Sequence, residues 1–168
     1  MSTKKHSDHP HLTGEHKFGD RGQLVLLLLF LCIWVSDSFV FQFSTFLRDM
    51  LPDYARVVSA ALVLMAGWYL ARGGMKAVFG TRRPEPTVID SGVFKIVRHP
   101  IYTGAILFYL GASLITLSLA SALFLIPIIG FYIWIARYEE RILTEQFGQD
   151  YINYKKKTGM LFPKLPSH

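Results

Sequence analysis

Three consecutive residues, Arg98, His99 and Pro100, stand immediately before a long uncharged apolar stretch. Proline favours the first position of a helix, where its missing N–H leaves no hydrogen bond unmade. The following amides, at the positive end of the helix dipole, readily bind a carboxylate or phosphate. The arginine and the imidazole add donors, and Gly104, one turn later, lets another group approach the backbone closely. This pattern predicts an anion-binding corner, although cations also commonly flank membrane spans.

Glu139 and Glu140 form an adjacent acidic pair where the last apolar stretch ends. The helix dipole disfavours an exposed acid at a helix C-terminus by about 0.3–1 kcal/mol. A cationic partner, either Arg98, Arg137 or a ligand, would offset this unfavourable interaction. The alternative is that the two acids lie at a solvated helix end. An anion corner and a carboxylate pair facing one pocket would suit a zwitterionic ligand.

The composition indicates a membrane protein. Hydrophobic residues make up 51% of the 168-residue chain, the mean hydropathy is +0.31, and the apolar residues come in blocks. The net charge of +6 fits an anionic lipid surface better than nucleic acid, because the cations lie beside apolar spans. A single cysteine, Cys32, excludes a cysteine metal cluster, and we expect no metal.

The longest uncharged stretch runs from residue 101 to residue 136. As one helix it would extend about 54 Å, far more than the roughly 30 Å of hydrocarbon in a bilayer, so we expect a hairpin. The predicted fold is all-α, with four transmembrane helices at about 24–47, 54–79, 100–117 and 120–137. A cytoplasmic amphipathic helix follows at about 138–157. We expect residues 1–23 to be a polar tail and residues 24–168 to form one domain.

The charge distribution predicts the orientation. Arg48 and Arg56 belong to the connection 48–56, and the other 16 of the 18 lysines and arginines belong to the N-terminal tail, the connection 72–98 or the C-terminal part. With four spans these three segments share one side of the membrane. The positive-inside rule makes that side cytoplasmic, so we expect both termini there, in a plasma or inner membrane.

Asp37 interrupts the first apolar stretch. A carboxylate inside a membrane is costly, which makes it a functional hypothesis by default. The alternative is a position at the far interface or a pair with an arginine.

Residues 92–104 resemble a pattern of the isoprenylcysteine carboxyl methyltransferase and phospholipid methyltransferase superfamily of integral membrane enzymes. The first motif is carried by Gly92, Phe94, Arg98, His99, Pro100, Tyr102 and Gly104. The C-terminal motif is carried by Glu139, Glu140, Leu143, Phe147, Gly148, Tyr151, Tyr154 and Pro163. The resemblance covers roughly residues 85–163, and no N-terminal motif matches.

The resemblance implies S-adenosylmethionine bound on the cytosolic side and a lipophilic acceptor that enters from the bilayer. The expected cofactor-binding residues are Phe94, Arg98, His99, Pro100, Ile101, Tyr102, Gly104, Glu139, Glu140 and Tyr151. We expect the start of the third span to hold the methionine carboxylate or the ribose. Glu140, with Glu139, would hold the ammonium group, and Phe94 and Tyr151 would enclose the adenine.

The acceptor decides which further residues are needed. For a carboxylate acceptor, Arg137 is the expected orienting residue. An amine or a thiol needs a base, for which Asp37 and Glu139 are candidates. The sequence leaves open the acceptor among prenylated cysteine, phospholipid amine and small lipophilic thiol, and it leaves open the oligomeric state. A membrane reductase that uses a nicotinamide cofactor and a non-catalytic membrane scaffold remain alternatives.

Overall fold

The computed structural model describes residues 19–80 and 86–164, and this part of the chain is helical. Only one isolated bridge, between Val97 and Gly159, has strand-like pairing there. The elements in order are α1 (Gly19–Val35), η3 (Ser36–Phe41), η4 (Phe46–Met50), α2 (Asp53–Phe79), η5 (Gly92–Lys95), α3 (Pro100–Thr116), α4 (Leu119–Phe147) and α5 (Gln149–Lys157).

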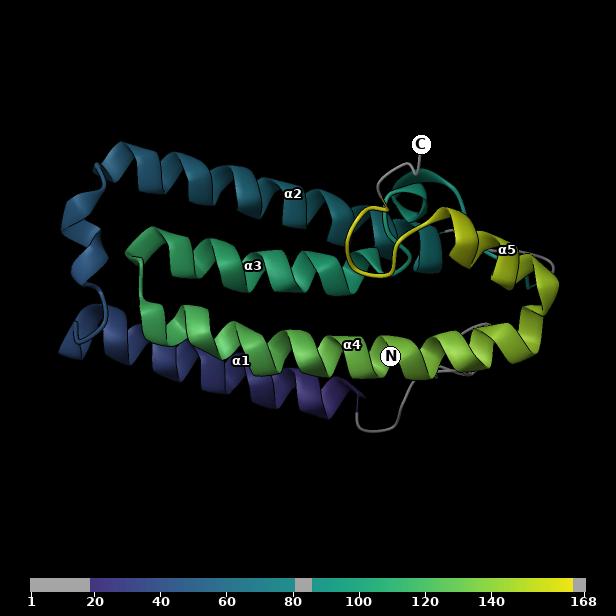
Figure 1. Ribbon diagram of the computed structural model, residues 1–168, viewed down its shortest axis with the longest axis horizontal. Coiled ribbons are helices and arrows are strands. Elements are labelled where there is room, and N and C mark those ends of the chain that lie inside the picture. The colour runs from purple at the N-terminus through teal and green to yellow at the C-terminus, as the bar shows by residue number, and fades with distance from the viewer. Residues whose placement is uncertain (1–18, 81–85, 165–168) are drawn as a thin grey trace, which may run out of the picture.

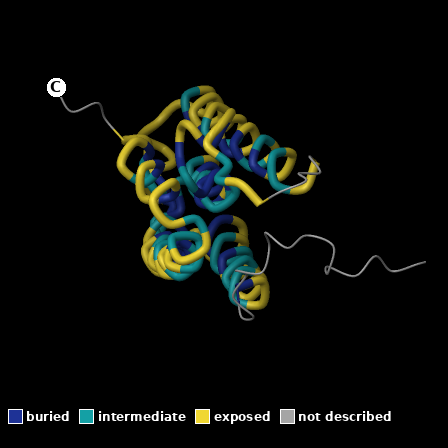
Figure 2. The backbone as a smooth tube through the Cα atoms, turned by 90° about the vertical axis from the view of Figure 1, so that its right-hand side faces the viewer, coloured by how far each residue is buried: buried dark blue, intermediate teal, exposed yellow. Residues whose placement is uncertain are grey.

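The long helices lie side by side in one elongated bundle (Figure 1). α3 packs along α2, and α1 packs along α4. Seen along the bundle, buried residues face its interior and exposed residues cover the outside (Figure 2). Many outward residues are large and apolar, such as Leu62, Leu123 and Ile126, as a lipid-facing surface requires.

Three helical segments are long and apolar enough to cross a membrane: Gly19–Phe41, Asp53–Phe79 and Leu119–Phe147. The remaining apolar helix, α3, has 17 residues, which corresponds to about 25 Å. The chain is therefore a multi-pass membrane protein, as the sequence predicted.

Glycines bring α2 and α3 into close contact. A Cβ atom at Gly104 would lie 2.7 Å from the Gly67 carbonyl oxygen and 2.8 Å from the Ala71 Cβ. A Cβ atom at Gly67 would in turn lie 3.0 Å from the Gly104 carbonyl oxygen. Small residues at membrane helix interfaces let backbones approach, and the gain is van der Waals contact. This contact fixes α3, and with it the helix start that the sequence singled out.

The turn between α3 and α4, at the opposite end of the bundle, is held by polar side chains. Asp37 accepts hydrogen bonds from the Ser44 amide at 2.9 Å, the Ser44 hydroxyl at 2.6 Å and the Ser118 hydroxyl at 2.5 Å. Ser118 is the N-cap of α4. Arg56 donates to the Ile115 carbonyl oxygen at 2.8 Å, near the end of α3. The negative Asp37 thus lies at the N-terminus of α4, and the positive Arg56 lies at the C-terminus of α3. Each charge has the sign that stabilises that end of a helix dipole.

Some element boundaries differ from the predicted ones. α1 begins at Gly19, inside the predicted tail, and regular α-helix stops at Val35, where a π-helical turn carries Asp37. The predicted boundary between the fourth span and the C-terminal helix does not exist, because α4 continues from Leu119 to Phe147. The break comes at Gly148, whose φ of +55° suits glycine.

Candidate functional site

The start of α3 is fixed by the C-terminal segment of the chain. The Arg98 amide donates to the Gly159 carbonyl oxygen at 2.8 Å, and the His99 amide donates to that of Met160 at 3.1 Å. The Thr103 hydroxyl donates to the Leu161 carbonyl oxygen at 3.0 Å. These bonds join segments about 60 positions apart, so residues 158–161 become part of the site.

Pro100 is the first residue of α3 and His99 is its N-cap. The Thr103 amide makes the first bond inside the helix, to the His99 carbonyl oxygen at 3.0 Å. The amides of Ile101 and Tyr102 precede it and have no carbonyl within the helix to bond. The positive end of the α3 dipole therefore lies at the cavity, which Ile101 and Tyr102 line.

Glu140 is the centre of a buried ionic network. Its Oε1 atom lies 2.7 Å from both Nε and Nη2 of Arg98, and its Oε2 atom lies 3.1 Å from Nζ of Lys155. The remaining Arg98 nitrogen, Nη1, donates to the carbonyl oxygens of Lys155 and Thr158. Arg98 therefore ties α4, the end of α5 and the start of α3 together.

Glu139 has different surroundings. Its Oε1 atom accepts a hydrogen bond from the Tyr102 hydroxyl, and its Oε2 atom lies 3.5 Å from Nδ1 of His99. The Glu139 side chain is 18% exposed, whereas that of Glu140 is 6% exposed. The His99 ring stacks on the Tyr102 ring, with centroids 5.5 Å apart.

His99 lies between the two carboxylates. Its buried Nε2 atom is 3.4 Å from Oε1 of Glu140 but is not aligned for a hydrogen bond, and no other described residue offers it one. Burial alone would lower the pKa of His99, but Glu139 and Glu140 outweigh burial and raise it above the ordinary value. The imidazole therefore carries a positive charge at a higher pH than a free histidine would.

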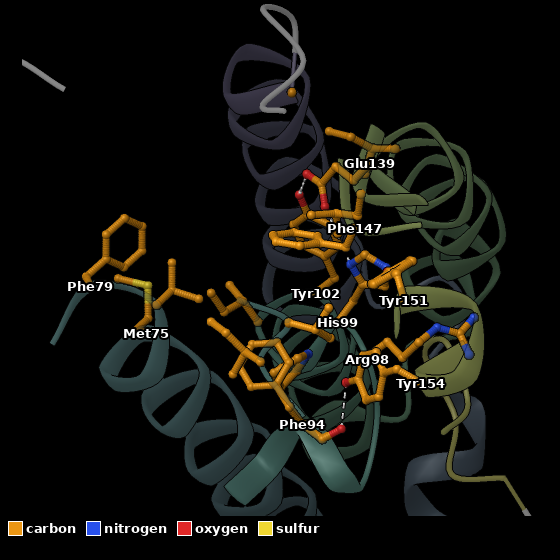
Figure 3. A pocket seen from close by; sticks show the side chains of 18 of the residues that line it. Met75, Phe79, Phe94, Arg98, His99, Tyr102, Glu139, Phe147, Tyr151 and Tyr154 are labelled. Atoms are coloured by element: carbon orange, nitrogen blue, oxygen red, sulfur yellow. Dashed lines mark hydrogen bonds and ion pairs between the residues drawn. The ribbon is translucent and has the colours of Figure 1, made fainter. Parts of the chain in front are cut away.

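These groups line a cavity of about 440 Å³, a size suited to one small-molecule ligand. His99, Tyr102 and Glu139 form a polar wall, and Met75 and Phe79 of α2 lie across from it (Figure 3). Aromatic residues of α4 and α5 close the side next to Arg98. The remaining lining residues include Gly19, Asp20 and Gln23 of α1, and Phe94, Leu143, Phe147, Tyr151 and Tyr154.

A sequence model of the phospholipid methyltransferase family matches residues 54–150, which include α3, α4 and all but the first residue of α2. The chain belongs to the phospholipid methyltransferase family.

Several relatives carry names that state a reaction. A methanethiol S-methyltransferase of Pseudomonas deceptionensis is 29% identical over 154 residues, which cover 84% of this chain and 56% of the relative. A protein-S-isoprenylcysteine O-methyltransferase of Saccharomyces cerevisiae is 31% identical over 136 residues, which cover 76% of this chain and 57% of the relative. The chain thus spans about half the length of these relatives. No solved structure matches it.

The structure brings most of the predicted cofactor-binding residues of this family member together. The members that line the cavity are Phe94, Arg98, His99, Pro100, Ile101, Tyr102, Glu139 and Tyr151. They come from η5, α3, α4 and α5 and the segment before α3. Their assembly depends on the α2–α3 contact and on the C-terminal segment.

Two predicted cofactor residues do not line the cavity. Glu140 lies behind Glu139, and its carboxylate is shared by Arg98 and Lys155. Gly104 lets a close neighbour approach, but that neighbour is the α2 backbone. The sequence indicated that some group comes close to the backbone at Gly104. It did not indicate that this group is the backbone of α2.

The two predicted catalytic residues also lie elsewhere. Arg137 is exposed and does not line the cavity. Asp37 lies by the α3–α4 turn, at the other end of α3 from His99, which corresponds to about 25 Å along the helix. Its three hydrogen bonds hold that turn. Neither Arg137 nor Asp37 lines this cavity.

The cavity also contains residues that the sequence did not indicate. Asp20 and Gln23 lie within the predicted tail, but the helix that carries them packs against α4. A Cβ atom at Gly22 would lie 2.5 Å from the Phe131 ring. A glycine in the first turn of a membrane helix was the available signal for such a contact.

Proposed function

We propose that the protein transfers a methyl group from S-adenosylmethionine to a lipophilic acceptor at the cytoplasmic face of a membrane. The observation that carries this proposal is the cavity itself, which the positive start of α3 and the Glu139 carboxylate line together. A zwitterionic amino acid group needs a positive partner for its carboxylate and a negative partner for its ammonium group. The cavity offers both.

The described residues fit S-adenosylmethionine. The positive start of α3, which lines the cavity, suits its carboxylate. Glu139 reaches the cavity and suits its ammonium group, which makes Glu139 a better ammonium ligand than Glu140. Phe94 and Tyr151 offer flat apolar surface to the adenine.

The cofactor supplies a methyl group on a positively charged sulfur. The work left to the protein is to orient two reactants and to keep water from them. The His99–Glu139–Tyr102 contacts hold the polar wall in one arrangement, and the carbonyls of residues 159–161 hold the start of α3. No metal ion is required for such a displacement.

The acceptor is proposed to reach the cavity from the bilayer. Met75 and Phe79 line the cavity and are also 50% and 42% exposed on the outside of α2. The relatives' names indicate acceptors that differ in chemistry, a thiol and an isoprenylcysteine. A phospholipid amine is a third class that the family description suggests.

We further propose four spans, with α3 as the short fourth one, and both termini in the cytoplasm. The start of α3 and the end of α4 then share the cationic side of the membrane. The positive charge of that side, with Lys155, Lys156 and Lys157 on α5, suits anionic headgroups. This orientation puts the cavity within reach of a water-soluble cofactor.

A thermal-shift titration of the detergent-purified protein tests the cofactor class. S-adenosylmethionine and S-adenosylhomocysteine should each raise the melting temperature, because a ligand at 100 times its Kd adds about 2.7 kcal/mol of stability. NADPH should leave it unchanged. A folded sample that responds to neither adenosyl ligand would contradict the proposal, and a response to NADPH alone would favour a reductase.

A further inference from the structure

Asp20 of α1 is a cavity residue that the proposed function has not used. It lies in the first turn of α1 and lines the cavity together with Gln23, while Met75 and Phe79 line it from α2. The contact between Gly22 and the Phe131 ring fixes this turn against α4. α1 runs antiparallel to α4 (Figure 1), so the first turn of α1 lies beside the part of α4 that leads to Glu139.

The other charged groups of the described cavity wall already have partners. Glu139 bonds to Tyr102 and lies by His99. Arg98 bonds to Glu140 and to two backbone carbonyls. Asp20 is an exposed carboxylate on the wall formed by α1, so a proton that it takes up can pass directly to water.

The sign of the Asp20 charge selects among acceptors. A carboxylate acceptor at this wall would meet a like charge, which is unfavourable. An S–H or N–H group would instead donate a hydrogen bond to the Asp20 oxygen. Arg137, which could have oriented a carboxylate, is exposed and lies outside the cavity wall.

We propose that Asp20 is the general base that takes the proton from a thiol or amine acceptor. This inference rests on the proposed function and specifies its substrate class as a nucleophile that loses a proton on methylation. In the step, a lone pair of the acceptor sulfur or nitrogen forms the new bond to the methyl carbon. The bond between that carbon and the sulfonium sulfur breaks, and its electron pair stays on the sulfur, which becomes a neutral thioether. The acceptor proton moves to the Asp20 carboxylate and then to water.

The test compares the wild type with the Asp20→Asn and Asp49→Asn variants of the full chain. Asp49 is a matched control, because it is also exposed but lies in η4 at the other end of the bundle. Affinity for S-adenosylhomocysteine is measured by calorimetry. Methyl transfer is measured between pH 6.5 and 8.5 with 1-octanethiol, with phosphatidylethanolamine vesicles and with an S-prenylated N-acetylcysteine.

We expect Asp20→Asn to lower kcat with the thiol or the amine by about 100-fold at pH 6.5, a usual contribution of a general base. Affinity for S-adenosylhomocysteine should match that of wild type. With the thiol, the residual rate should rise about tenfold per pH unit, because only acceptor that is already a thiolate then reacts. Asp49→Asn should behave like wild type, and whether the thiol or the amine reacts identifies the acceptor.

Three results would overturn the proposal. A rate for Asp20→Asn equal to that of Asp49→Asn would show that no proton passes to Asp20. A loss of S-adenosylhomocysteine affinity in Asp20→Asn would make the residue a cofactor ligand. Transfer to the prenylated cysteine alone would identify a carboxylate acceptor. Wild type that fails to bind S-adenosylhomocysteine would instead contradict the proposed function, on which the inference rests.

Discussion

Glu139 and Glu140 are adjacent in sequence but have different tasks in the structure. Successive residues of a helix point about 100° apart, so only one of them faces the cavity. Glu139 does so, while Glu140 turns toward Arg98 and Lys155. The sequence pattern identified the pair and its basic partner. It did not tell the two acids apart, because the face that α4 presents depends on its packing.

Replacement of Glu140 by glutamine should chiefly lower stability. Removing one partner of a fully buried ion pair costs on the order of 3–5 kcal/mol, and we expect less here because Lys155 is partly exposed. The measurement is the melting temperature in detergent, with the exposed residue Glu145 changed to glutamine as the control. Equal melting temperatures for the two variants would contradict a structural role for Glu140.

His99 should make stability depend on pH. Its pKa is raised in the folded protein above the ordinary value of about 6.5. Its contribution is therefore complete below about pH 6.5 and is lost as the pH rises through the raised pKa. The melting-temperature difference between wild type and a His99→Gln variant should shrink between pH 6 and pH 9. A difference that grows over this range would contradict the assignment.

At the scale of helices, the contact between α2 and α3 positions the site. It depends on glycines because two helix backbones meet where a side chain would otherwise stand. The sequence revealed the glycines and both helices. It could not reveal that Gly104 faces Gly67, because the pairing of two helix faces depends on residues far apart in the chain.

A Gly104→Ala variant should be destabilised. Its Cβ would lie 2.7 Å from a backbone oxygen, so one helix must move away. The control is Gly130→Ala in α4, where a Cβ would meet nothing within 4 Å and alanine favours the helix by up to about 1 kcal/mol. Thermal melting should give a lower midpoint for the first variant only. Equal midpoints would contradict the close contact.

The network around Asp37 should be separable from the site. An Asp37→Ala variant leaves the Ser44 and Ser118 donors without their acceptor, which costs about 1–3 kcal/mol for each such buried group. We expect a lower melting temperature with unchanged affinity for S-adenosylhomocysteine in the folded fraction. A variant that melts like wild type but has lost methyl transfer would restore a catalytic role for Asp37.

At the scale of the molecule, the sequence predicted an all-helical membrane protein and its family, and eight of its ten predicted cofactor residues line the cavity. Apolar stretches and charges are local signals, and they gave α2 almost to the residue. The cavity wall from α1 was missed because polar residues at a helix start look like a tail. The bonds from residues 159–161 to the start of α3 were missed because long-range pairing leaves no periodic pattern.

The two ends of the bundle therefore differ in role. Charged residues at one end surround a cavity, and charged residues at the other end close a turn. Asp37 belongs to the second group. Its hydrogen bonds to Ser44 and Ser118 offset the cost of placing a carboxylate in an apolar segment.

The central claim is that the cavity between α1, α2, α3 and α4 holds the adenosyl cofactor, with Glu139 facing it. Calorimetric titration of S-adenosylhomocysteine into wild type and a Glu139→Gln variant tests this claim most directly. Wild type should bind one equivalent, and the variant should bind roughly 10–100-fold more weakly, as expected for the loss of a charged hydrogen bond. Equal affinities of the two folded proteins, or no binding to wild type, would contradict the account.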